Sequence, residues 1–254
     1  MAFPSIASRT GYTTPASNNT TWAAFSGVSL PAHSLAIFIL SVDGPILAHS
    51  ESGGNGWTAE STQGNGNGAV QGRIFTKHNA TDSAFNIAFT ASFAGATEQA
   101  SGILIIVSPS AGGTLTWQVS SPATGSGSNS NPPNLSITGG PLDILAIATR
   151  SGDAQAVPTV APPGYSNLTN QAASGSLGAS TTCADRTVEG AFAEDPGTFT
   201  VANEQWVCFT IAVIETGGGG TTDGAGSASA TGSATAVGGS TAAANGAASG
   251  TGSA

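Results

Sequence analysis

The apolar segments of this chain constrain its fold most strongly, because they are short, rich in β-branched residues and separated by clusters of Gly, Pro, Asn and Ser. This pattern is typical of β-strands. No stretch shows the sustained 3.6-residue period and the caps of an amphipathic helix. The strongest predicted strands are 35–42, 102–107, 142–148 and 206–214, and the weaker ones are 73–77, 85–89, 114–119, 187–192 and 198–201. About eight to eleven short strands predict an all-β fold, a β-sandwich or a jelly-roll-like arrangement.

A comparison of the chain with itself indicates an internal repeat. An apolar strand, a Gly-aromatic corner, a basic residue, a Glu-Gln pair and a closing apolar strand occur twice in one order. The first set is Leu35 to Leu40, Gly56-Trp57, Arg73, Glu98-Gln99 and the strand ending at Val107; the second is Leu142 to Ile147, Gly164-Tyr165, Arg186, Glu204-Gln205 and the strand ending at Ile214. We interpret the sets as two related halves, forming two small sandwiches or one sandwich with pseudo-two-fold symmetry. The alternative is that all-β proteins share this order of strands and loops by chance.

Composition along the chain predicts the domain boundaries. We expect residues 1–123 to form a first β half and residues 134–216 a second, which either forms a sandwich of its own or shares one with the first. The connector between them, residues 124–133, carries no large apolar side chain. Residues 217–254 form a Gly/Ala/Ser/Thr-rich tail whose one sizeable apolar residue is Val237. Ordering a residue costs about 1–2 kcal/mol, so we expect this tail to be disordered unless neighbouring chains order it.

Charge excludes several classes of partner. Charged residues make up 7% of the chain, against about 25% in an average globular protein. Fourteen acidic residues outnumber five basic ones, which argues against nucleic acid and against anionic membrane surfaces as partners. The N-terminal stretch MAFPSIASRT has neither a basic region nor a continuous apolar region, and no run reaches the length of a membrane span. We therefore expect no secretory signal and no membrane insertion, in a protein that works outside a cell or packed in an assembly.

Catalytic and metal-binding patterns are scarce. His33, His49 and His78 are far apart and belong to no metal-binding motif, and no GxSxG elbow occurs. The tight acidic group in EDPG at 194–197 is first of all a turn. A glycan-processing enzyme would need two carboxylates facing each other across a cleft, which a sequence cannot show. We therefore predict a protein that is not an enzyme and that has no metal and no cofactor.

Two pairs of residues are candidates for a site. Trp57 and Tyr165 each follow a glycine at matching places, and an exposed aromatic ring beside polar amides can stack on a sugar; a core or corner position is the alternative. Cys183 and Cys208 would face each other, as partners for a disulfide, if the EDPG turn closed a simple hairpin. The segment ANEQ at 202–205 looks like a second turn, which would break that register. Both alternatives stay open at this point.

Several stretches resemble a family of tailed-bacteriophage virion proteins with a β-sandwich body. They are MAFP at the start, the segment at 29–44, the Gly-Trp corner at 56–57, PPNLSITGGPLDILAIA at 132–148, PPGY at 162–165 and EDPGTFTVANEQWVCFTIAVIE at 194–215. The tail from 226 is similar to the small-residue linkers of phage structural proteins. The resemblance implies a homo-oligomeric structural protein of the virion surface, as capsid decoration, short head fibre or tail-associated component, with other virion proteins as partners. The alternative is a tail-fibre adhesin that binds a receptor or a host surface glycan. The resemblance assigns no functional residues.

Overall fold

The computed structural model describes residues 3–14, 21–43, 49–52, 56–64, 70–93, 99–110, 113–137, 143–153, 156–173, 178–190 and 192–216. These residues form sixteen β-strands and no helix, which confirms the predicted all-β class. The described part of the chain accordingly contains no helix long and apolar enough to cross a membrane. The predicted tail at 217–254 lies outside the described residues.

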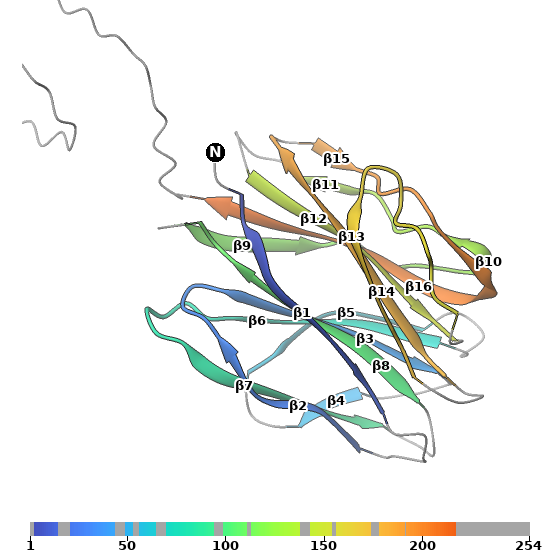
Figure 1. The fold of residues 1–254 in the computed structure, drawn as a ribbon, viewed down its shortest axis with the longest axis horizontal. Helices are drawn as coiled ribbons and strands as arrows, with labels where there is room; N and C mark the ends of the chain where they lie inside the picture. Colours follow the sequence, from blue (N-terminus) through green and yellow to red (C-terminus); the bar gives the residue numbers. More distant parts are fainter. Residues whose placement is uncertain are drawn as a thin grey trace, which may run out of the picture. The chain divides into compact units, whose positions relative to one another are not determined.

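The strands fall into two inner sheets and two small outer sheets (Figure 1). The first inner sheet has the order β1-β8-β3-β6-β5, and β2-β7-β4 form the first outer sheet. Their bounds are β1 (Ser5–Thr13), β2 (Thr21–Leu30), β3 (Leu35–Asp43), β4 (His49–Ser52), β5 (Thr58–Gly64), β6 (Val70–His78), β7 (Phe85–Phe93) and β8 (Ala100–Ser108).

Strands β9 to β16 build the other two sheets, so the second half begins with β9 at Thr114, before the predicted end of the first half at residue 123. The second inner sheet has the order β10-β16-β12-β14-β13, and β9 pairs with the end of β16 beyond β10; β11 and β15 form the second outer sheet. Their bounds are β9 (Thr114–Val119), β10 (Ala123–Ser130), β11 (Leu135–Ile137), β12 (Asp143–Gly152), β13 (Ser166–Ala172), β14 (Ser180–Glu189), β15 (Phe192–Glu194) and β16 (Phe199–Thr216).

Apolar side chains fill the space between each pair of neighbouring layers. The inner sheets pack face to face over a core that includes Ile37, Ile105, Ile147 and Phe209. A second core, rich in aromatic rings, joins the other face of the first inner sheet to β2 and β7. Smaller apolar clusters lie on the outer face of the second inner sheet. Strands β3 and β12 are covered on both faces, so buried residues follow one another along them without the alternation of a strand that has one face in water.

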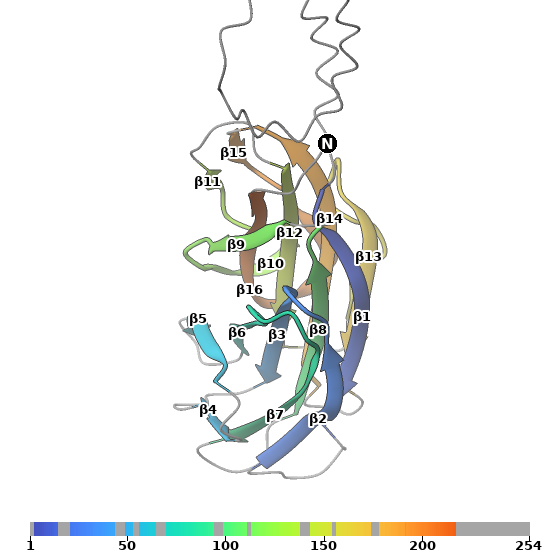
Figure 2. The same cartoon turned by 90° about the vertical axis from the view of Figure 1, so that its left-hand side faces the viewer.

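The two inner sheets share one connectivity. Strand β3 lies between β6 and β8 in the first inner sheet, and β12 lies between β14 and β16 in the second in the same way (Figures 1 and 2). The two corners, at Gly56 and Gly164, lie 108 residues apart, and both glycines have left-handed backbone angles, with φ of 64° and 79°.

The register of the repeat differs from the sequence prediction by one residue. Pairing Leu35 with Leu142 would match Ile37 with Ile144, yet Ile37 lies in the core between the inner sheets and Ile144 in an outer cluster. A separation of 108 instead matches Ile37 with Leu145, and both lie in the inner core. A slip of one residue turns every side chain of a strand to the opposite face, so the burial of these residues decides between the two alignments.

Two predicted loops are strands. The predicted connector at 124–133 is wrong for most of its length, because Ala123–Ser130 forms β10 and pairs with β16. The predicted second turn at 202–205 lies inside β16, whose 18 residues run from Phe199 to Thr216. Small polar residues reach strand conformation in β10 because β16 supplies the ladder of hydrogen bonds, which local propensity does not reveal.

Candidate functional site

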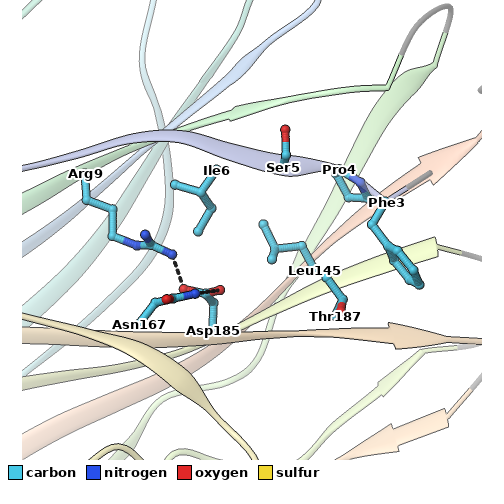
Figure 3. A pocket seen from close by; sticks show the side chains of 9 residues that line it. All are labelled: Phe3, Pro4, Ser5, Ile6, Arg9, Leu145, Asn167, Asp185 and Thr187. Atoms are coloured by element: carbon cyan, nitrogen blue, oxygen red, sulfur yellow. Dashed lines mark hydrogen bonds and ion pairs between the residues drawn. The ribbon is translucent and has the colours of Figure 1, made fainter.

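A pocket of about 270 Å³ opens between the start of β1 and the second inner sheet (Figure 3). Ile6 of β1 and Leu145 of β12 line it as apolar walls. Its polar end is formed by Arg9 of β1, Asn167 of β13 and Asp185 of β14. Residues from four strands and from both halves of the chain thus meet at this pocket.

An ion pair between Arg9 and Asp185 dominates the polar end of the pocket. Asn167 donates a second hydrogen bond, from Nδ2 to Oδ2 of Asp185, at 3.1 Å. Asn167 has φ of 54° within an irregular part of β13, a conformation that asparagine tolerates better than most residues. The ion pair of Arg9 with Asp185 therefore acts as a clamp between the inner sheets, while Asn167 holds the other carboxylate oxygen of Asp185 from within the second inner sheet.

A related clamp occurs on the opposite side of the inner sheets. Arg9 of β1 pairs with Ile105, and Trp117 of β9 pairs with Val213. Trp117 lies 108 residues after Arg9 and Val213 lies 108 residues after Ile105, so the two pairs are equivalent in the repeat. Trp117 donates a hydrogen bond from Nε1 to Oε1 of Glu60, at 2.8 Å. One carboxylate therefore fastens the two inner sheets together at each side.

The structure places Trp57 in the core. Its side chain is 8% exposed, and the ring packs edge-on against Phe25 and Phe89. Its Nε1 donates to the carbonyl oxygen of Ala88, at 2.9 Å. The ring faces are therefore covered, and the prediction that Trp57 binds a glycan is wrong because a stacked sugar needs an open ring face.

Tyr165 occupies the matching corner of the second half and is also 8% exposed. Its hydroxyl donates to Oε1 of the fully buried Glu194, at 2.6 Å, and Glu194 forms an ion pair with Arg186. Burial, together with the neighbouring carboxylate, raises the pKa of Tyr165 above its usual range. The prediction of a glycan-binding Tyr165 is wrong for the same reason as for Trp57, and the corner alternative describes both residues.

The predicted disulfide does not form, and both cysteines are free and buried. Cys183 of β14 is the cross-strand partner of Thr149, and Cys208 of β16 is the partner of Arg150, so β12 lies between them. Two strand spacings are roughly 9–10 Å, beyond the roughly 7 Å limit for Cα atoms joined by a disulfide. Burial raises the pKa of the Cys183 thiol to about 12. Neither thiol is therefore a ready nucleophile.

A buried ion pair between Arg150 and Glu204 is the polar feature that sequence reasoning missed. The Arg150 side chain is fully buried and also donates hydrogen bonds to Oγ of Ser130, at 3.1 Å, and of Ser180, at 3.2 Å. Burial lowers the pKa of Arg150 to about 10, so the guanidinium stays charged at neutral pH. The three partners come from three other strands of the same sheet, and no local signal in the sequence connects them to Arg150.

Of the three histidines, the structure describes the side chains of His33 and His78, and these two lie apart. His33 lies on the surface, with Nε2 2.9 Å from Oδ1 of Asp82, and the ring of His78 lies 5.7 Å from that of Trp117. The side chain of His49 lies outside the described residues. Among the residues that the structure describes, no three His, Cys, Asp or Glu side chains are grouped so that they could hold a metal ion.

Comparisons with protein-family models, with curated proteins and with solved structures found no match. The chemistry of the described residues therefore has to be judged from their geometry alone. Three Arg-carboxylate pairs join strands to one another, and two of these pairs have a carboxylate that is almost completely buried. These contacts suit the maintenance of a rigid body.

Proposed function

We propose that this chain is a non-enzymatic structural protein on the surface of a tailed-bacteriophage particle, acting as capsid decoration or as a short head fibre. In this role it assembles as a homo-oligomer and contacts other virion proteins. The particle surface is also where it is located, after synthesis in the host cytoplasm.

The use of the charged side chains carries this proposal. Arg9, Arg150 and Arg186 are three of the five basic residues of the chain, and all three are paired with carboxylates inside the β body. An enzyme places charged side chains in an open cleft, whereas these charged side chains join one strand to another. A rigid body with few surface charges and several sheet edges is suited to packing against neighbours in a shell. The stretches that resemble phage virion proteins support the same role.

The adhesin alternative loses its two candidate residues. Trp57 and Tyr165 are both buried, so neither ring offers a face to a sugar. The Gly- and Asn-rich segments at 53–56 and 64–68, which could add polar contacts to a glycan, lie largely outside the described residues. We therefore do not propose glycan binding.

Immunogold labelling of intact phage particles, with an antibody against this chain, tests the proposed function. We expect gold over the head, scored by electron microscopy, with particles of a phage that lacks this gene as the control. Labelling confined to the tail tip would contradict decoration of the head, and unlabelled particles would contradict a place on the virion surface.

A further inference from the structure

The edges of the two inner sheets differ in how they are protected against pairing with another chain. A regular, uncharged edge strand is a template for a further strand, and proteins usually block such edges with bulges or charges. Strands β1, β5, β10 and β13 lie at these edges, and each has an irregular register with its neighbour. Arg9 of β1 and Trp117 of β9 each contact the other inner sheet, so the two strands differ in their register and charge and not in these contacts.

Strand β9 lacks both kinds of protection. Its six residues, TLTWQV, include no charge, no Gly and no Pro. They pair with β16 without any shift in register, from Val119 opposite Ile211 to Thr114 opposite Thr216. Within the described part of the chain, β16 is the one strand that pairs with β9. The opposite edge of β9 is therefore regular, neutral and rich in residues that favour strands.

The direction of the backbone groups of β9 follows from its ladder with β16. The backbone N–H of Ser120 donates to the carbonyl oxygen of Thr210, at 2.9 Å, so residue 120 points its backbone groups toward β16. Because this direction alternates along an antiparallel strand, Leu115, Trp117 and Val119 point their N–H and C=O groups away from β16. Three donors and three acceptors thus lie along the outer edge.

The side chains of β9 suit a continuing sheet. Thr114, Thr116 and Gln118 are exposed, while Leu115 is buried and Trp117 is partly buried against the inner core. A strand added to this edge would place its own apolar row beside Trp117 and extend that core. The added strand therefore needs the same alternation of apolar and small polar residues as β9 itself.

We propose that the edge of β9 pairs antiparallel with the β9 edge of a second copy of this chain, around a two-fold axis. A neutral strand is complementary to itself because no like charges meet, and an isologous contact needs only that each copy present the same surface. Residues with outward backbone groups must meet each other, so the axis passes at a residue and not between two residues; axes at Trp117 and at Thr116 keep the largest part of β9 paired. This inference rests on the proposed assembly role and names the surface through which the homo-oligomer forms.

Sedimentation velocity of the full chain over a range of concentrations tests the proposed pairing. The wild-type chain should show a reversible monomer–dimer equilibrium. Thr116→Lys places a charge on the edge at an exposed position, and it should raise the dimer dissociation constant at least about tenfold. The matched control is Ser8→Lys, an exposed position on β1, which should dimerise like the wild type. Unchanged circular dichroism and melting will show that each variant is folded; Gln118→Lys replaces Thr116→Lys if that variant is not.

A mixing experiment separates self-pairing from other contacts. With either position of the axis, residue 116 of one copy lies opposite or diagonal to residue 116 of the other. A mixture of the Thr116→Lys and Thr116→Glu variants therefore brings opposite charges together and should restore the dimer. A wild-type chain that stays monomeric, or a Thr116→Lys dimer as tight as the wild type, would overturn the inference. Labelled phage particles with a monomeric chain would refute the β9 contact alone. Dimers with unlabelled particles would refute the virion role alone.

Discussion

Gly102 of β8 provides the space for the ring of Phe38, and substitution of this glycine should destabilise the protein. A Cβ added at Gly102 would lie 2.6 Å from Cε2 of Phe38, closer than real Cβ contacts come. Phe38 is fully buried and packs against Tyr12, Phe25 and Phe89, so its ring has no free space to move into. Overpacking of this kind typically costs about 1–3 kcal/mol.

A double-mutant cycle in urea measures this coupling. Gly102→Ala should lower the free energy of unfolding by about 1–3 kcal/mol in the wild-type background. In a Phe38→Leu background the overlapping ring atoms are gone, so the same substitution should cost at least about 1 kcal/mol less. Fluorescence of Trp22 and Trp57, which lie in the same core, reports the unfolding.

The control combines Gly102→Ala with Ile147→Val, because Ile147 lies in the core between the inner sheets and does not belong to the core of Phe38. These two substitutions should be additive within about 0.5 kcal/mol. An equal cost of Gly102→Ala in the Phe38 and Leu backgrounds would refute the steric argument.

Three further predictions concern buried polar groups. Glu204→Gln removes the ion-pair partner of the buried Arg150 and should cost about 3–5 kcal/mol in urea unfolding. The double variant Arg150→Met/Glu204→Met should cost less, and a more costly double variant would contradict this. Glu194→Gln weakens the contacts to Tyr165 and should cost about 1–3 kcal/mol, measured by thermal melting beside the exposed control Glu189→Gln; equal melting temperatures would argue against it. The Cys183 thiol should resist a thiol reagent until urea unfolds the chain. Because burial raises the pKa of this thiol from 9.0 to about 12, the thiol ionises between about pH 9 and pH 12 only in the unfolded chain. The free energy of unfolding should therefore fall as the pH rises through this range. Rapid labelling of the native protein would oppose the prediction.

The fold class and the strongest strands could be predicted from the sequence. The apolar run at 35–42 became β3, the run at 102–107 became β8 and the segment at 114–119 became β9. These segments consist mostly of apolar or β-branched residues, so the local pattern and the tertiary structure agree. Strand β10 was missed because its residues are small and polar, and only the neighbouring strand β16 holds them in a sheet.

The candidate site was harder to predict than the fold. The two Gly-aromatic corners could be predicted at the right positions, because a glycine with a left-handed backbone angle followed by an aromatic residue is a pattern visible in the sequence. Their exposure was not predictable, because the residues that cover Trp57 come from strands β2 and β7. The clamp of Arg9 on Asp185 joins positions 176 apart in the chain, for which neither residue type nor spacing gives a signal.

What the sequence by itself determined is the set of strands with strong patterns and the order in which they recur. Only the tertiary structure decided their register and neighbours. Strands β3 and β12 are buried on both faces, so they lack the alternation that would show which residues face which sheet. Strand β12 lies between β14 and β16 and thereby keeps the two cysteines apart, although β14 and β16 are closer to each other along the chain. Hydrogen bonds between strands join backbone groups that are chemically alike at every residue, so packing between the sheets has to select the partners.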